Sequence, residues 1–357
     1  MGEFDLPRMG RIRNYRSIIL IIIGNVAFIL YLWFFVGFEA LASFLSRLNV
    51  YQYAFYYSIA AIALLLSVFF DSLIWHSLLK PLSVKIKLRK LFLYNWIGNF
   101  IEMVIPCETV CGEVTRIYLS QKETSSDAGI AAVPVISSRI ISTFIYTTGL
   151  IIGFISLVVT RNIPVYLAGV LAIILFGTGA VIGAVFYLAF KEGATERLVT
   201  LLMRLAKIIT KNQARLEQLK EKLIKSFSSF NNSFKIYKDH PRYLIQPVIY
   251  AVIAWIFSLL VYLLVFYSLN FDGISIIDLT LIYCVSATVE TVTAGFPVGA
   301  VEITMINLYA LYGVPLVVAG AATTLTRLLT FWVQVIIGYP IVQFTEVKEV
   351  LKGSYLL

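Results

Sequence analysis

Long apolar stretches alternate with short polar segments along most of the chain. Six of them have about 20 residues or more, the length a helix needs to cross roughly 30 Å of hydrocarbon. A strand of a membrane barrel would instead be about 10 residues of alternating polarity. The pattern therefore predicts an all-α polytopic integral membrane protein whose six full transmembrane helices lie at residues 17–36, 52–76, 128–159, 165–190, 243–269 and 314–339.

Two further apolar stretches are shorter and are interrupted by polar residues. The first, Leu91 to Pro106, contains Glu102, and the second, Asp278 to Gly295, contains Glu290 and is followed by Phe296 and Pro297. Irregular backbone at membrane depth is tolerated only inside protein or beside a watery cavity. We expect both to be re-entrant or broken helical hairpins. If the second crosses fully, the chain has eight spanning helices instead.

The two interrupted stretches share an order of features. Each has a Glu in a short helix, a Pro break, a Gly and a Glu just beyond it, and an Arg inside the next apolar helix. This order predicts one transmembrane domain over residues 1–357 that contains two repeats, at 91–160 and 278–341, and opposite directions of entry would make them inverted. The matched residues are Glu102, Pro106, Gly112, Glu113 and Arg139 in the first half, and Glu290, Pro297, Gly299, Glu302 and Arg327 in the second.

Composition agrees with a membrane protein. Hydrophobic residues make up 59% of the chain and charged residues only 14%, against about a quarter charged in soluble domains. The net charge of +9 comes from Lys and Arg clustered beside apolar spans, as topology signals are. We therefore expect no nucleic-acid partner and anionic lipid headgroups as the contacts of these clusters.

Basic segments also predict the orientation. Four Arg residues precede the first span, and residues 80–90 carry five Lys or Arg after the second. Two crossings place both clusters on one side, which the positive-inside rule makes cytoplasmic. The first span has no small-x-small cleavage site, so we expect an uncleaved helix rather than a signal peptide. The prediction is a multi-pass plasma-membrane protein with a cytoplasmic N-terminus.

Residues 191–242 form a hydrophilic segment, with 12 Lys or Arg and 5 Asp or Glu. From Leu198 to Ile209 apolar residues recur at i, i+3, i+4 spacing between basic ones, which predicts a basic amphipathic helix at the cytoplasmic interface. Binding of anionic lipid and a connector that fixes topology are equally good explanations.

Charged groups inside a membrane are costly and usually mark function. Arg139 and Arg327 offer planar guanidinium groups that match phosphate bidentately, and helix ends at the breaks favour anions. The alternative is that each Arg pairs with a Glu simply to lock the bundle. We expect a substrate site at Arg139, Arg327, Glu113, Glu302, Arg116, Glu102 and Glu290, with helix breaks at Pro106, Gly112, Pro297 and Gly299.

The sequence offers little to an enzyme. There are only two His and three Cys, and the spacing of Cys107 and Cys111 is not a zinc pattern. No GxxxxGK[ST] phosphate loop occurs, so direct ATP coupling is not expected. The GxxxG pairs at Gly149 and Gly153 and at Gly179 and Gly183 suit close helix packing within the chain, with homo-oligomerisation as the alternative.

The two Pro-containing runs resemble a known family. Pro106-Cys-Glu-Thr-Val-Cys-Gly112-Glu113-Val-Thr-Arg116 is similar to the Pro, Gly-Glu, Arg signature of the lysylphosphatidylglycerol synthase transmembrane, or flippase-like, family. Phe296-Pro297-Val-Gly299-Ala-Val-Glu302, followed by Gly313-Val-Pro315 and Thr326-Arg327, resembles its second signature.

The resemblance implies a domain that moves lipids between leaflets, as in the multiple peptide resistance factors. The first run departs from the family in having Cys107, Glu108 and Cys111 where small residues are commoner, which leaves the lipid open. No soluble aminoacyl-transfer domain follows, so lipid synthesis is not predicted. We expect a cofactor-free flippase for a phosphate-containing phospholipid or lipid-linked sugar. An enzyme acting on a lipid phosphate and a non-transporting partner subunit are the alternatives.

Overall fold

In the computed structural model the described residues are 28–104, 108–160, 213–292 and 297–343, with isolated positions at 23 and 26 and between 169 and 183. All regular structure in these residues is helical. Four helices, one of them composite, are long and apolar enough to cross a membrane. They are α3 (Val50–Leu79), α6 (Ala128–Thr160), α10 (Ile245–Ser268), and α13 (Leu316–Arg327) continued by the π-helical η4 (Leu328–Val333) and α14 (Gln334–Gln343). The all-α polytopic prediction is confirmed.

The first expected span is described only in its second half. Helix from Phe28 through η1 (Leu32–Val36) bends by 82° into α2 (Phe38–Ser46). The bend falls at Gly37, whose φ of 81° is in the region that favours glycine. The expected spans 17–36 and 52–76 leave no helix between them, so α2, which follows the bend, was not predicted. This pair makes a fifth span at most, and the expected span at 165–190 lies almost wholly outside the described residues.

The two interrupted stretches each pair with a second short helix. The first hairpin is α4 (Leu88–Val104) and α5 (Glu108–Thr124), of 17 residues each. The second is α11 (Ile276–Val292) and α12 (Pro297–Leu311), of 17 and 15 residues. Each helix is shorter than the roughly 20 residues of a full crossing, which favours hairpins over two crossings.

The breaks differ in how much of them is described. The expected break at Pro106 falls at residues 105–107, outside the described part of the chain, and α5 begins just beyond it. In the second hairpin the backbone leaves helical geometry at Val298 and Gly299, where φ reaches 94°. Only glycine adopts such a φ readily, so Gly299 fixes the place of the second break.

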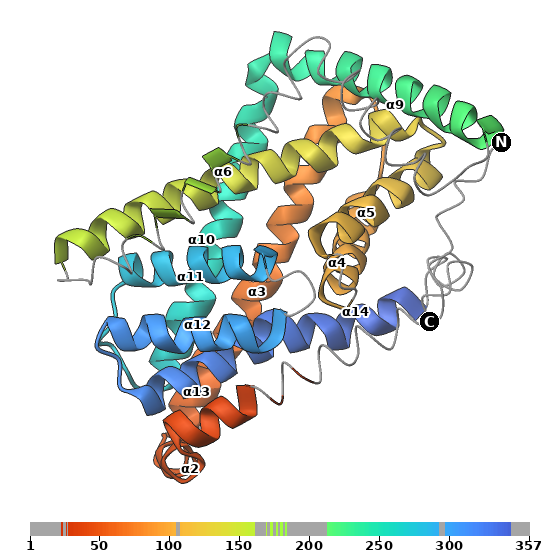
Figure 1. Cartoon of the computed structure of the whole chain (residues 1–357). Coiled ribbons are helices and arrows are strands. Elements are labelled where there is room, and N and C mark those ends of the chain that lie inside the picture. Colours follow the sequence, from red (N-terminus) through yellow and green to blue (C-terminus); the bar gives the residue numbers. More distant parts are fainter. Residues whose placement is uncertain are drawn as a thin grey trace.

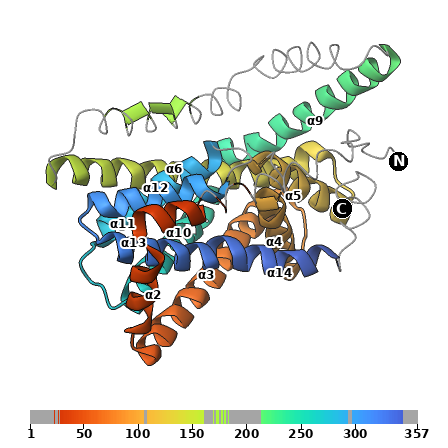
Figure 2. The same ribbon diagram turned by 60° about the horizontal axis from the view of Figure 1, so that its bottom comes forward.

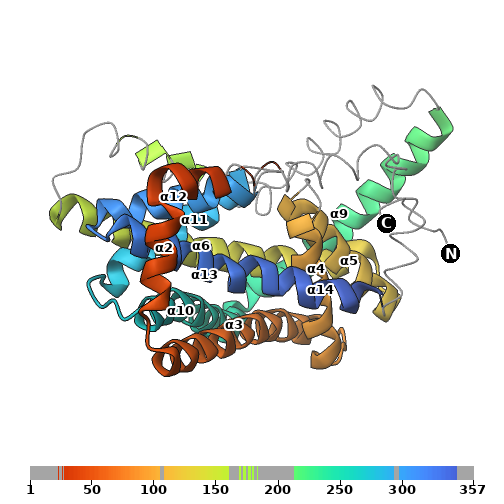
Figure 3. The ribbon, with the colours of Figure 1, turned by 90° about the horizontal axis from the view of Figure 1, so that it is seen from below.

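The hairpins lie on opposite sides of the bundle (Figures 1 and 3). Helices α3 and α10 form the most extensive helix pair, and the first hairpin packs against α3, α6 and α14. The second packs against α6, α10 and α13, around a core of fully buried side chains. Helix α6 therefore contacts both hairpins, whereas α3 packs against the first hairpin and α10 against the second.

The GxxxG pair of α6 allows a close approach to the second hairpin. A side chain at Gly149 would meet Sγ of Cys284 in α11 at 3.0 Å as well as the Trp255 ring of α10 at 2.9 Å, and one at Gly153 would meet Cβ of Leu281 in α11 at 2.7 Å. These contacts are within the chain, as the packing interpretation of this motif requires. Neither Gly179 nor Gly183 has a neighbour within 4 Å among the described atoms.

The hydrophilic segment contains one described helix, α9 (Gln213–Asp239), which projects from the bundle in Figure 2. Its C-terminal end packs on α3 and α6, where Tyr237 donates a hydrogen bond to the Leu78 carbonyl. Burial raises the pKa of the Tyr237 hydroxyl, so it remains a donor. Helix α9 then joins α10 through η3 (Pro241–Leu244), beside η2 (Lys80–Leu82) at the end of α3. The predicted amphipathic run, Leu198–Ile209, lies outside the described residues.

Candidate functional site

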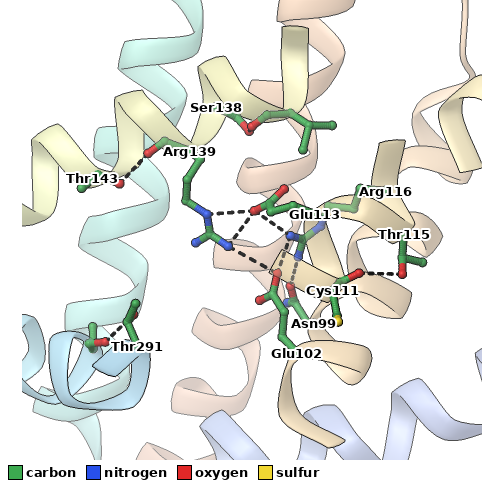
Figure 4. Close-up of polar contacts among 12 residues, drawn as sticks. Asn99, Glu102, Cys111, Glu113, Thr115, Arg116, Ser138, Arg139, Thr143 and Thr291 are labelled. Carbon is green, nitrogen blue, oxygen red and sulfur yellow. Dashed lines mark hydrogen bonds and ion pairs between the residues drawn. The ribbon is translucent and has the colours of Figure 1, made fainter. Parts of the chain in front are cut away.

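The first hairpin and α6 bring four charged side chains together. Arg139 of α6 donates from Nε to Oε1 of Glu113 at 2.8 Å and from Nη2 to Oε1 of Glu102 at 3.3 Å. Arg116 of α5 lies 2.7 Å from Glu102 and 3.0 Å from Glu113. Figure 4 shows both guanidinium groups meeting the same two carboxylates. We call this set of residues, Glu102, Glu113, Arg116 and Arg139, the first cluster.

Local sequence explains this arrangement. Glu113 and Arg116 are three residues apart and share one face of α5. A side chain at Gly98 would overlap the Arg116 guanidinium, and one at Gly112 would overlap the Glu102 carboxylate. The two glycines therefore leave the space in which the charged groups meet. Asn99 accepts a further hydrogen bond from Arg116 Nη2.

The second hairpin and α13 form an equivalent set. Arg327, the last residue of α13, donates from Nε to Glu302 at 2.7 Å and from Nη1 to Glu290 at 3.0 Å. The other oxygen of Glu302 accepts the Gly299 backbone N–H at 2.5 Å. One donor freed by the break is thus bound by Glu302 and is not open to an external anion. We call Glu290, Glu302 and Arg327 the second cluster.

The two clusters use the same connections. In each, the Arg Nε binds the Glu of the second hairpin helix, 26 or 25 residues away in sequence. A terminal nitrogen binds the Glu of the first hairpin helix, 37 residues away in both cases. This agreement in side-chain geometry comes from segments with little sequence identity. The first cluster differs by having Arg116, which makes it formally neutral where the second carries one negative charge.

The clusters also differ in exposure. The Arg139 side chain is 41% exposed, and those of Glu102 and Glu113 about half that, at 21% and 19%. In the second cluster Arg327 is 6% exposed and Glu302 3%, while Glu290 is 37% exposed. A buried ion pair is tolerated only when its groups are well satisfied, and Arg327 meets this by binding two carboxylates and lying 5.0 Å from the Phe331 ring. The first cluster is open and the second closed.

Each half is also bonded to the other half. Tyr146 of α6 shares a hydrogen bond of 2.8 Å with Tyr283 of the second hairpin. Asn99 of the first hairpin donates to Gln334 of α14 at 3.0 Å. Tyr146 follows Arg139 by seven residues, and Gln334 follows Arg327 by seven. We call these two hydrogen bonds the cross-braces.

The structure thus places all seven predicted binding residues in two clusters. Sequence reasoning missed Asn99, Tyr146, Tyr283 and Gln334, which complete the polar network. The spacing of seven residues after each Arg was the available signal. Asp71 of α3, which interrupts an apolar run, also lies near enough to interact electrostatically with the arginines of the first cluster. Among the described residues no three His, Cys, Asp or Glu side chains group to hold a metal ion.

Comparison with known proteins agrees with this geometry. The profile of the lysylphosphatidylglycerol synthase TM region matches residues 18–338, which include both hairpins and both clusters. The chain belongs to that family. The predicted resemblance is confirmed, and the protein is a membrane protein related to the membrane regions of lipid-modification proteins.

Three relatives are named UPF0104 membrane proteins. That of Methanocaldococcus jannaschii is 27% identical over 337 residues, covering 93% of this chain and 95% of the relative. That of Pyrococcus horikoshii is 22% identical, covering 90% and 95%. That of Methanothermobacter thermautotrophicus is 23% identical, covering 72% and 76%. No solved structure matches the chain.

Proposed function

We propose that this protein moves a phosphate-containing lipid, a phospholipid or a lipid-linked sugar, between the two leaflets of the plasma membrane, and that Arg139 binds the phosphate. The observation that carries this proposal is the state of the Arg139 side chain. It is 41% exposed, and within the described residues its Nη1 has no hydrogen-bond partner. Two N–H groups are therefore available to an anion, from a guanidinium already oriented by Glu113.

Binding of phosphate at Arg139 would compete mainly with Glu102, whose 3.3 Å contact is longer than the two contacts of Arg139 with Glu113, at 2.8 and 2.6 Å. Glu102 keeps Arg116 at 2.7 Å, so its charge stays compensated when Arg139 turns toward the lipid. Glu113 holds the Arg139 Nε throughout. Arg139 can thus exchange Glu102 for the lipid phosphate without leaving either carboxylate unpaired. This lowers the free-energy cost of moving a charged group at membrane depth.

The second cluster would play the same part in the opposite conformation. Its connections match those of the first, but Arg327 is buried against Glu290 and Glu302. Transport by alternating access requires one half-site to open as the other closes. The observed difference in exposure supports such a cycle, with the hairpins as inverted repeats. Because the sequence contains no GxxxxGK[ST] loop, the proposed cycle involves no direct coupling to ATP.

The orientation follows from the basic segments. The basic residues 80–90 and the C-terminal end of α9 lie at the same end of the bundle, because Tyr237 binds Leu78 there. The positive-inside rule assigns this end to the cytoplasm. Anionic headgroups of the inner leaflet would be the partners of the basic residues of α9.

Reconstitution tests the proposal. The full chain is placed in liposomes with fluorescent phospholipids in both leaflets, and a membrane-impermeant quencher reports leaflet exchange. Exchange faster than in empty liposomes, and slowed by Arg139→Ala, is expected. Exchange equal to that of empty liposomes for every headgroup class would refute it. Chromatography of the same lipids detects headgroup turnover, which would instead indicate an enzyme. If neither leaflet exchange nor headgroup turnover is observed, the role of a partner subunit is left.

A further inference from the structure

A pocket lies at the end of α3 remote from the basic residues 80–90. It has a volume of about 380 Å³, within the lower range of small-molecule sites. Helix α3 has 30 residues and so is about 45 Å long, enough to put the pocket at the opposite membrane face. Its lining consists of Gln52, Tyr56, Tyr267, Asn270, Phe271 and Asp272.

The pocket is fixed by contacts between α3 and the loop after α10. The Gln52 side chain donates to the Tyr267 carbonyl at 3.3 Å and to Asn270 Oδ1 at 3.2 Å. Asn270 has a φ of 55°, which lets the chain turn sharply after α10. Asn49 caps α3 by accepting N–H groups of its first turn. These bonds hold the walls in place without a ligand, so binding would require little reordering.

Three of the six lining residues are aromatic. The Tyr56 and Tyr267 rings lie 5.7 Å apart, and the Phe271 ring packs at 5.8 Å from Phe266. A side chain at Gly273 would meet the Phe271 ring at 2.8 Å, so glycine at this position leaves room for the ring. The faces of such rings carry negative partial charge and attract cations.

One carboxylate completes the pocket. Asp272 is exposed and has no hydrogen bond or ion pair within the described part of the chain. The loop from Leu269 to Ser275 contains no Lys or Arg, although the chain as a whole carries +9. A phosphate would meet Asp272 with no compensating cation. An organic cation would be attracted by both the carboxylate and the rings.

We propose that this pocket binds an ammonium group. Its source is the headgroup of a zwitterionic or cationic lipid reaching the outer leaflet, or a soluble amine of the same chemistry. The lipid source rests on the proposed function, whereas binding of the ammonium group does not. In the lipid case the pocket would favour exchange of headgroups that carry an amine as well as a phosphate.

Calorimetry with the full chain in nanodiscs of ammonium-free lipid tests ammonium binding. Choline is the probe, and 3,3-dimethylbutanol, which has the same shape without charge, is its matched control. Choline is expected to bind at least tenfold more tightly than the alcohol. Asp272→Asn should weaken choline binding at least tenfold, and Tyr56→Leu should weaken it more than Tyr56→Phe. Glu39→Gln on neighbouring α2 should leave it unchanged. Equal binding of choline and the alcohol, or no effect of Asp272→Asn, overturns the proposal.

Leaflet exchange distinguishes the two sources of the ammonium group. If a lipid is the ligand, Asp272→Asn slows exchange of choline- and ethanolamine-headgroup lipids severalfold and leaves glycerol-headgroup lipid unchanged. If choline binds but headgroup preference is unaffected, a soluble amine is the ligand. If the unsubstituted protein binds choline but exchanges no lipid, the proposed function is refuted and the assignment of the pocket as an ammonium site stands.

Discussion

Glu302 joins Arg327 to the broken backbone of the second hairpin. One of its oxygens lies 2.7 Å from Arg327 Nε, and the other accepts the Gly299 N–H. Both side chains are less than a tenth exposed. A single carboxylate therefore satisfies a buried guanidinium and a backbone donor that the helix break has freed. The charge that closes the second cluster also stabilises its irregular backbone.

Replacing Glu302 by Ala should destabilise the protein strongly. Breaking a buried pair by removing one partner costs about 3–5 kcal/mol, and here the Gly299 N–H also loses its acceptor. Thermal unfolding in detergent measures the change. The control is Lys90→Ala, which breaks the more exposed pair with Glu123 and should cost about 1 kcal/mol or less. Equal melting temperatures for the two variants would contradict this account of the break.

Arg139 and Arg116 should separate transport from stability. Arg139→Ala is expected to lower leaflet exchange at least tenfold with little loss of stability, because its side chain is 41% exposed. Arg116→Ala should lower the melting temperature as well, since Arg116 is 9% exposed and binds two carboxylates. Exchange and thermal unfolding are measured on the same preparations. If Arg139→Ala destabilises as much as Arg116→Ala, Arg139 serves the bundle rather than the lipid.

Small residues at positions 98 and 112 should be required by the first cluster. A methyl group at Gly112 would overlap Glu102, and one at Gly98 would overlap Arg116. We expect Gly98→Ala and Gly112→Ala to cost about 1–3 kcal/mol as overpacking and to slow exchange. The control is Gly179→Ala, whose methyl group meets no neighbour among the described residues and which should be neutral or slightly stabilising. Unchanged melting for both cluster variants would show that the charged groups can move aside at no cost.

Removing a cross-brace should change the rate of the conformational cycle. Tyr146→Phe deletes the bond to Tyr283, a net loss of about 0.5–1.5 kcal/mol. If the bond breaks as the hairpins exchange states, this loss raises the exchange rate by roughly 2- to 10-fold. Gln334→Leu should act in the same direction by removing the bond from Asn99. Ser67→Ala, which removes a 2.8 Å bond between α3 and α10, should leave the rate unchanged, and an equal effect there would refute the role of the braces.

Sequence reasoning placed the long helices well because length and hydropathy decide them. The expected spans 52–76 and 243–269 correspond to α3 and α10 within three residues at each end. It missed α2 because the 82° bend depends on one residue, Gly37. Arg139 and Arg327 could be predicted as site residues because they are isolated charges within apolar sequence.

Other features of the site could not be read from the pattern. Asn99 and Gln334 are ordinary polar residues until the fold brings α4 beside α14. The capture of the Gly299 N–H by Glu302 depends on φ and ψ at the break. The difference between the open and closed clusters is a property of the conformation. Residue spacing, which is nearly identical in the two halves, carries no information about it.

The π-helical turn η4 allows a change of helical register in the last helix that α6 lacks. It begins directly after Arg327 and ends directly before Gln334, whereas α6 continues as α-helix past Arg139 and Tyr146. A π turn holds one residue more than an α turn. Shifting that extra residue along the helix would rotate the residues it passes by about 100° while most backbone hydrogen bonds persist. If the extra residue passes Arg327, the guanidinium turns away from Glu302, and the closed half opens by a change of helical register rather than by a rigid tilt.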